Sequence, residues 1–322
     1  MSGSLPEPVL ALLRGAGLCG SAERPRGAEL AGGVSSEIWR VGLANGPVCV
    51  KRALPRLRVA QLWEAPVERN QYEHEWLRVA NQAAPGSAPR VLARGDGMFA
   101  MEYLGHPLWK DQLRQGRADP AFAAAVGRTL AAIHRGTAGK PEIARRFPTD
   151  AIFHAIRLEP YLLATAARHP DLQERIASIC KKTFSTKSCL VHGDVSPKNI
   201  LVGPSGPVFL DAECAWHGDP AFDLAFCLTH LLLKCLWVRD AAQGFLECFD
   251  ALAHAYSPEQ SLESRAASLL PALLLARVDG KSPVEYLDAA DQQHVRRVAR
   301  PLIWSPPQSL REVREAWQRS LT

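Results

Sequence analysis

The chain has 322 residues, of which 47% are apolar and 22% are charged, and its formal net charge is +5. This composition excludes an intrinsically disordered chain, and the small, dispersed basic excess disfavours a nucleic-acid-binding protein, which usually carries a clustered basic surface. The length predicts two domains or one bilobal unit, with enough chain to bury a large core.

The first third of the chain is predicted to be rich in strands. In chain order, its elements are a helix over 5–18, a loop over 21–33, strands over 38–41 and 48–51, a loop or broken helix over 53–66, a helix over 67–80, and strands over 91–93 and 98–104. Asn45-Gly46 between the first two strands is a strong hairpin signal. We therefore expect an N-terminal domain of residues 1–104.

The chain changes character at Gly105-His106-Pro107, after which helical patterns dominate. The predicted elements are helices over 121–134, 152–167 and 172–183, a strand–loop–strand block over 190–211, and a mostly helical remainder from 222 onward. The segment after Glu213 is expected to pass directly into a helix. These elements predict a larger C-terminal domain of residues 105–322.

Eight cysteines predict a reducing compartment, because none forms a CxxC pair or has zinc spacing and most lie in apolar runs. Arg14 interrupts the apolar stretch 9–13, so the N-terminus does not have the pattern of a signal peptide. The longest apolar run, 224–238, is shorter than the roughly 20 residues of a membrane-spanning helix. We expect a cytoplasmic protein with no nucleic-acid or membrane partner, and its oligomeric state stays open.

The most informative segment is the stretch VHGDVSPKNILV over 191–202, which is followed by Asp211-Ala212-Glu213. A phosphoryl-transfer site needs an Asp on a loop to accept the proton of the attacking hydroxyl. It also needs an Asn five residues later and a second Asp after the next strand to hold the metal ions that bridge the phosphates. These oxygen ligands suit Mg²⁺.

The segments HGDVSPKN, FLDAE and GDPAFDLA occur in this order within residues 192–225. Together they resemble the aminoglycoside phosphotransferase superfamily of small-molecule kinases, which includes choline kinases and methylthioribose kinases. The resemblance covers residues 30–240. It implies an α+β, protein-kinase-like bilobal fold with a small strand-rich N-lobe and a larger, mostly helical C-lobe. It also implies that the protein uses ATP as the phosphate donor and Mg²⁺ as a cofactor. The acceptor would be a hydroxyl of a small aminoglycoside-like, amino-alcohol or sugar-like molecule.

The resemblance assigns roles to residues of the C-terminal motifs. Asp194 is the expected catalytic base, and Asn199 and Asp211 are the expected metal ligands, with Glu213 acting on a second metal ion or through water. Three other motif residues are expected to be structural: His192, which braces the loop, and Asp219 and Asp223 near a helix start.

The resemblance also assigns a nucleotide site to the N-terminal domain. The loop AGGVSSE over 31–37 is expected to cover the phosphates with Gly32, Gly33, Ser35 and Ser36. Lys51 at the end of its strand matches a phosphate-binding lysine, and Glu73, rather than Glu68 or Glu75, is its expected carboxylate partner. The segment FAMEYLG over 99–105 resembles the hinge, at about 101–106, where adenine would bind the backbone around Glu102 and Leu104.

Two other interpretations are weighed against a small-molecule kinase. A protein kinase is disfavoured because Asp-Ala-Glu stands where protein kinases have Asp-Phe-Gly and because no activation segment follows. A catalytically silent relative acting as a sensor is disfavoured because Asp194, Asn199 and Asp211 are all present. Lys198 either approaches the γ-phosphate or faces solvent.

The acceptor's charge is a separate expectation. Residues 240–290 hold eight acidic and three basic residues, which could form an acidic wall that favours amine-bearing or neutral acceptors, or only solvated helix faces. Asp279 is the acid expected to face the cleft.

Overall fold

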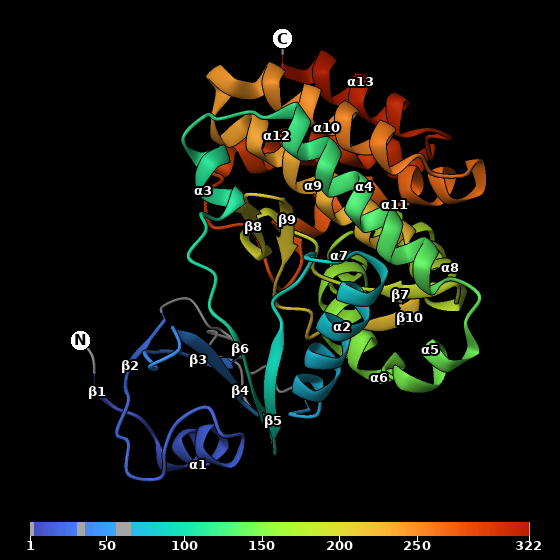
Figure 1. The fold of residues 1–322 in the computed structure, drawn as a ribbon. Coiled ribbons are helices and arrows are strands. Elements are labelled where there is room, and N and C mark those ends of the chain that lie inside the picture. Colours follow the sequence, from blue (N-terminus) through green and yellow to red (C-terminus); the bar gives the residue numbers. More distant parts are fainter. Residues whose placement is uncertain (1–2, 31–35, 56–65, 322) are drawn as a thin grey trace.

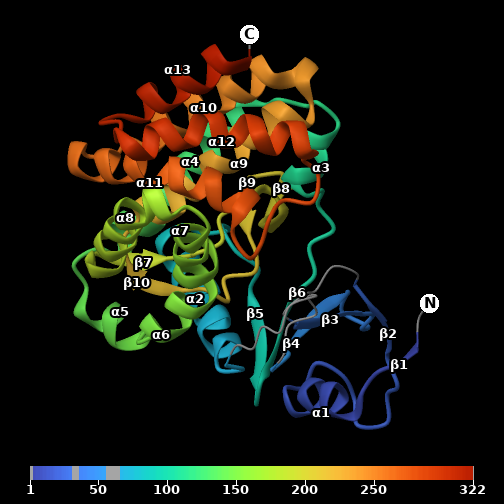
Figure 2. The same cartoon turned by 180° about the vertical axis from the view of Figure 1, so that it is seen from behind.

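The computed structural model describes residues 3–30, 36–55 and 66–321, and it shows an α+β fold with a small strand-rich lobe and a larger helical lobe (Figures 1 and 2). The small lobe contains the strands β1 (Gly3–Ser4), β2 (Arg26–Glu29), β3 (Ser36–Val41), β4 (Val48–Ala53), β5 (Val91–Gly95) and β6 (Met98–Glu102) and the helices α1 (Glu7–Gly15) and α2 (Arg69–Ala83). The strands form one antiparallel sheet in the order β1-β2-β3-β4-β6-β5.

Alternation along β4 determines what each face of this sheet contacts. Val48 and Val50 belong to a cluster with the apolar side chains of α1, whereas Cys49 belongs to the main core with the apolar side chains of α2. Successive side chains of a strand point to opposite faces. Lys51 therefore lies on the α2 face of the sheet.

The larger lobe is built on helices around one buried helix. It contains α3 (Trp109–Arg114), α4 (Pro120–Thr137), α5 (Pro141–Arg146), α6 (Asp150–Phe153), a π-helical stretch (His154–Leu163), α7 (Ala164–Arg168), α8 (Gln173–Ser185), α9 (Ala221–Trp237), α10 (Ala242–Tyr256), α11 (Gln260–Asp279), α12 (Ala289–Trp304) and α13 (Leu310–Leu321). Helix α9 is buried on all sides, as expected for a helix that is hydrophobic around its whole circumference. No helix in the described part of the chain is long and apolar enough to cross a membrane.

Two short β-ladders form the part of the larger lobe that faces the sheet. β8 (Ile200–Gly203) pairs with β9 (Gly206–Phe209), and β7 (Cys189–Val191) pairs with β10 (Trp216–Gly218). The loop between β7 and β8 carries the motif HGDVSPKN. In Figure 1, β8 and β9 lie between the helices above and the sheet below.

The structure differs from the sequence-based expectations about elements at three places. The 21–33 segment contains β2, which pairs with β3 despite its Gly- and charge-rich sequence. The chain after Glu213 forms β10 before it enters α9, because Trp216 pairs opposite Val191. The single helix expected over 152–167 has a π-helical middle, where Pro160 cannot donate an ordinary helical hydrogen bond.

The contact between α4 and α10 gives a stability prediction. A Cβ at Gly127 of α4 would lie 2.3 Å from the Leu252 carbonyl oxygen and 3.0 Å from the Tyr256 nitrogen, both backbone atoms of α10. Gly127→Ala is therefore expected to lower the free energy of unfolding by about 1–3 kcal/mol or more, as overpacking does. The urea midpoint and Tm measure this effect.

The matched control is Gly15→Ala at the end of α1, where a Cβ would have no neighbour within 4 Å. That variant should be neutral or slightly stabilised, because alanine favours the helix over glycine. Equal stabilities of the two variants would contradict the close packing of α4 on α10.

Candidate functional site

A buried lysine joins the two lobes. The Lys51 ammonium group on β4 donates to Glu73 Oε1 on α2 at 2.7 Å and also pairs with Asp211 Oδ1, which follows β9. Burial alone lowers the pKa of Lys51, but the charges of Asp211 and Glu73 outweigh it and hold this pKa above its ordinary value. Lys51 is therefore a permanent cation at the junction of β4, α2 and the DAE motif.

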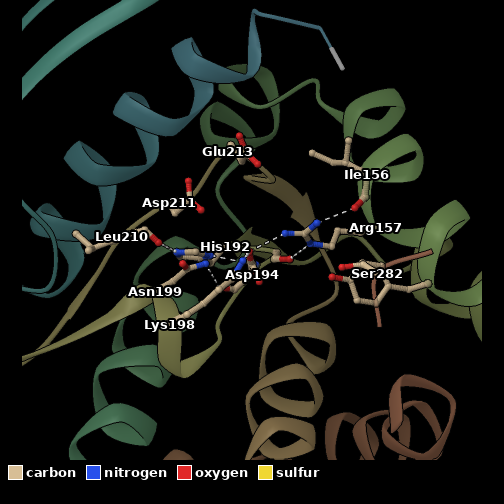
Figure 3. Close-up of polar contacts among 12 residues, drawn as sticks. Ile156, Arg157, His192, Asp194, Lys198, Asn199, Leu210, Asp211, Glu213 and Ser282 are labelled. Atoms are coloured by element: carbon tan, nitrogen blue, oxygen red, sulfur yellow. Dashed lines mark hydrogen bonds and ion pairs between the residues drawn. The ribbon is translucent and has the colours of Figure 1, made fainter. Parts of the chain in front are cut away.

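Asp211 itself adopts an unusual backbone conformation. Its φ of 65° lies in the left-handed region, which non-glycine residues rarely occupy and which occurs often at functional sites. The preceding residue, Leu210, donates its backbone N–H to the Asn199 carbonyl at 2.9 Å. This bond brings the two expected metal ligands, Asn199 and Asp211, next to each other (Figure 3).

The loop that carries Asp194 is held by Asp223 and His192. Asp223, in the first turn of α9, accepts the backbone N–H groups of His192 and Gly193, both at 2.7 Å. The His192 ring accepts the Asp194 N–H at its Nδ1 atom, at 3.1 Å, and donates from Nε2 to the Leu210 carbonyl at 3.0 Å. His192 thus braces the loop against the Asp211 segment, which is the role that the sequence predicts.

Gly193 is required by its position in the same loop. Its φ is 79°, and a Cβ there would lie 2.7 Å from both the side chain and the carbonyl oxygen of Cys214. No other residue type fits this position without moving the chain.

The Asp194 carboxylate lies between two cations. Its Oδ2 atom is 2.9 Å from the Arg157 guanidinium and 3.4 Å from the Lys198 ammonium group. Burial alone raises the pKa of Asp194, but Lys198 and Arg157 outweigh it and keep this pKa well below its ordinary range. Asp194 is therefore ionised at neutral pH.

Arg157 is the functional neighbour that the sequence reasoning missed. It comes from the π-helical stretch, and besides Asp194 it binds the Gly193 carbonyl and the Ile156 carbonyl (Figure 3). No motif surrounds it, and it lies 36 residues before Gly193 in the chain. Only the fold brings it to the catalytic loop.

The remaining predicted residues occupy several different environments. Glu213 Oε2 accepts a hydrogen bond at 3.1 Å from Arg69, a buried residue at the start of α2. Glu102 binds Arg90 through both its backbone N–H and its carboxylate, and Leu104 follows it beyond the end of β6. Ser36 is buried as the first residue of β3. Gly32, Gly33 and Ser35 lie outside the described residues.

Asp219 and Asp223 have structural partners. Asp219 caps the start of α9 through the Ala221 N–H and is bound by both arms of Arg265 at 2.8 and 3.0 Å. The expectation that Asp279 faces the cleft is wrong, because Arg296 and His169 bind its carboxylate. Asp279 is the last residue of α11, and its carboxylate is paired with these two side chains.

The donor set near Asp211 fits Mg²⁺. The Asn199 side-chain nitrogen donates to the Asp194 carbonyl at 3.1 Å, which leaves its side-chain oxygen for a cation. One carboxylate and one amide oxygen, completed by phosphate oxygens and water, are typical of magnesium bound with a nucleotide. Among the described residues, no group of three or more His, Cys, Asp or Glu side chains could hold a metal ion by itself.

Known proteins resemble this chain in sequence and in fold. The methylthioribose kinase of Yersinia pseudotuberculosis is 27% identical over 314 residues, covering 78% of this chain and 77% of that protein. The crystal structure of an aminoglycoside phosphotransferase from Alicyclobacillus acidocaldarius superposes with a TM-score of 0.53 at 17% identity, covering 100% and 96% of the two chains. An ethanolamine kinase from Plasmodium vivax has a TM-score of 0.52 at 12% identity, covering 97% and 85%.

The structural neighbours establish the protein-kinase-like fold of this family. The sequence pattern of the phosphotransferase enzyme family matches residues 26–257, which is more than half of the chain. This protein therefore belongs to the phosphotransferase enzyme family, the superfamily of small-molecule kinases that its three motifs resemble.

Proposed function

We propose that this protein transfers the γ-phosphate of ATP to a hydroxyl group of a small molecule, of aminoglycoside-like, amino-alcohol or sugar-like type. The observation that supports this most strongly is the convergence of Asp194, Asn199, Asp211 and Lys51 at one junction between the lobes. Each has the chemical type that phosphoryl transfer needs. The silent-relative alternative has no such support, since the base and both metal ligands are intact.

In this proposal the acceptor hydroxyl binds Asp194. Its oxygen attacks the γ-phosphorus, the bond from that phosphorus to the bridging oxygen of ADP breaks, and the hydroxyl proton passes to Asp194. Lys51 binds the ATP phosphates and stays oriented by Glu73. Asn199 and Asp211 would hold Mg²⁺, which would supply positive charge against the phosphate oxygens.

The nucleotide would lie between the sheet and the β8–β9 ladder. We place the hinge at residues 101–106, between the N-terminal domain 1–104 and the C-terminal domain 105–322, with adenine on the backbone around Glu102 and Leu104. The Glu102 N–H is already bound to the Arg90 carbonyl, so backbone groups other than this N–H would contact the base. Glu213 supports the site through Arg69 and reaches a metal ion only through water.

The cysteines support an intracellular, reducing environment for this reaction. All eight are free, and seven of them are buried. We therefore propose a cytoplasmic location.

Asp194→Asn is expected to reduce phosphate transfer at least 10²-fold while ADP–Mg²⁺ binding is retained. The reason is that the side chain acts on the acceptor, and loss of a general base costs about 10²–10⁴-fold. Transfer from labelled ATP to a panel of hydroxyl compounds, and calorimetric binding of ADP, measure the two effects. Asp240→Asn on the exposed surface is the control. A variant that keeps a tenth of wild-type turnover contradicts the role of Asp194.

Asp211→Ala is expected to abolish metal-dependent ATP binding, and Asn199→Ala to weaken it, because both side chains would hold Mg²⁺ against the phosphates. Titration of Mg²⁺ at fixed ATP should show that both variants need a higher Mg²⁺ concentration than the wild type, whereas the control Asp240→Ala needs the same concentration. An unchanged curve for Asp211→Ala excludes this metal site.

Lys51→Ala is expected to lower kcat/KM for ATP more than Lys198→Ala does. Lys51 is 2% exposed between two carboxylates, whereas the Lys198 side chain is 54% exposed and interacts mainly with Asp194. Steady-state kinetics with ATP as the varied substrate decide between them, with Tm recorded to verify folding. Equal losses of kcat/KM in the two variants would contradict the proposed contact of Lys51 with the phosphates.

A further inference from the structure

In the described part of the chain, two buried basic side chains near the catalytic loop have no carboxylate partner. Lys234 on α9 is 1% exposed, and its ammonium group lies 3.9 Å from the Trp237 ring centroid and 3.7 Å from that of Tyr286. Arg277 on α11 is 9% exposed and donates only to neutral oxygens, those of Tyr161 and Ser282. Across residues 3–30, 36–55 and 66–321, no acid lies within ion-pair distance of either group.

A chain of contacts connects this cluster to Asp194. Arg157, which binds Asp194, lies 5.5 Å from the Tyr161 ring centroid, and Tyr161 accepts a hydrogen bond from Arg277 at 3.3 Å. Figure 3 shows Ser282, the other partner of Arg277, on the same side of the catalytic loop as Arg157. The Lys234–Arg277 cluster thus borders the position where an acceptor would bind.

Helix α9 connects the surroundings of Asp194 with the Lys234–Arg277 cluster. Phe226 lies 5.9 Å from the Arg157 guanidinium, and His230 packs edge-on against Phe226 one turn later. Lys234 follows after one more turn, about 6 Å further along the axis. Burial and the charges of Arg277 and Lys234 lower the pKa of His230, whereas the charge of Asp194 raises it, so the cluster and the Asp194 carboxylate both lie near this ring.

Aromatic contact alone does not compensate for the burial of Lys234. Contact with two aromatic faces stabilises an ammonium group by less free energy than its burial costs. Burial, together with the nearby Lys110 and Arg277, lowers the pKa of Lys234 to about 7, although Glu285 opposes this shift. Glu285 itself is bound to Lys110 at 2.6 Å.

Two buried donor atoms of this cluster also have no hydrogen-bond partner within residues 3–30, 36–55 and 66–321. They are Arg277 Nε and Tyr286 Oη. Buried polar groups are normally hydrogen-bonded, so each unpaired group needs an explanation. An anion would satisfy Lys234, Arg277 and Tyr286 together.

The acids of residues 240–290 do not supply this anion: Asp279 is the buried one among them, and it has other partners. Asp279 is bound by Arg296 and His169, and Asp250 by Arg314. These two carboxylates are therefore paired with cations of the protein and do not contribute a free negative charge.

We propose that the acceptor carries an anionic group, a carboxylate or a phosphate ester, that binds Lys234, Arg277 and Tyr286 while its hydroxyl binds Asp194. This proposal rests on the proposed kinase function and narrows its substrate class. Sugar acids, sugar phosphates and hydroxylated amino acids fit, whereas polycationic aminoglycosides and neutral polyols lack the group that these residues bind.

The test is equilibrium binding to the ADP–Mg²⁺ complex of the full chain by calorimetry. The matched probes are ribitol, ribonate, ribitol 5-phosphate and 1-amino-1-deoxyribitol. Ribonate or ribitol 5-phosphate should bind at least about tenfold more tightly than the neutral and amine probes, as a charge-assisted hydrogen bond allows. The difference between the two anionic probes distinguishes carboxylate from phosphate.

Three variants identify the residues responsible. Lys234→Met should remove the preference for the anion, and Tyr286→Phe should weaken anion binding about three- to tenfold. The Tyr286 hydroxyl has no hydrogen-bond partner among the described residues, so its removal should leave Tm unchanged. This variant keeps the test valid if Lys234→Met fails to fold. Lys187→Met is the control, because Lys187 also lies over two aromatic rings but is paired with Asp150.

The outcomes separate the two proposals. Failure of ADP–Mg²⁺ to bind would contradict the kinase proposal itself. Normal ADP–Mg²⁺ binding with no preference for the anionic probes, including no binding of any probe, would overturn the anion site. An anion preference that survives both Lys234→Met and Tyr286→Phe would also overturn it.

Discussion

The ion pair of Lys51 with Glu73 and Asp211 is the interaction on which the arrangement of the site depends. It joins a strand and a helix of the small lobe to the segment after β9 in the large lobe. A buried cation of this kind is stable only while its carboxylates stay in place, because its separation from them leaves an uncompensated charge. The position of α2 is therefore linked to the position of Asp211. Any motion between the lobes would move Lys51, Glu73 and Asp211 relative to one another.

A second set of contacts fixes the catalytic loop to the large lobe. Asp223 accepts two consecutive backbone N–H groups of the loop, and His134 approaches the same carboxylate at 3.2 Å. His192 then ties the loop to the segment that carries Asp211. Asp194 is thus positioned because a carboxylate on a buried helix accepts backbone N–H groups of its loop, and such support from a rigid element keeps a site's geometry precise.

The fold was predictable where local signals and packing agree. The β3–β4 hairpin follows from Asn45-Gly46, and Gly46 has the positive φ that such a turn requires. β2 and β10 were not predictable, because their short sequences have no strand pattern of their own and pair only when a neighbouring strand is present. The π-helical stretch likewise depends on the packing around Pro160.

The sequence by itself determined the family, the fold class and the motif residues, because the HGD, DAE and GDP segments keep fixed spacings over a short range. The tertiary structure decided which distant side chains complete the site. Arg157 reaches Asp194 from a motif-free helix, and Lys234 and Arg277 meet from α9 and α11. Counting acids along the chain could not show which of them face the acceptor, because electrostatic partners are set by distances in space rather than by sequence neighbourhood.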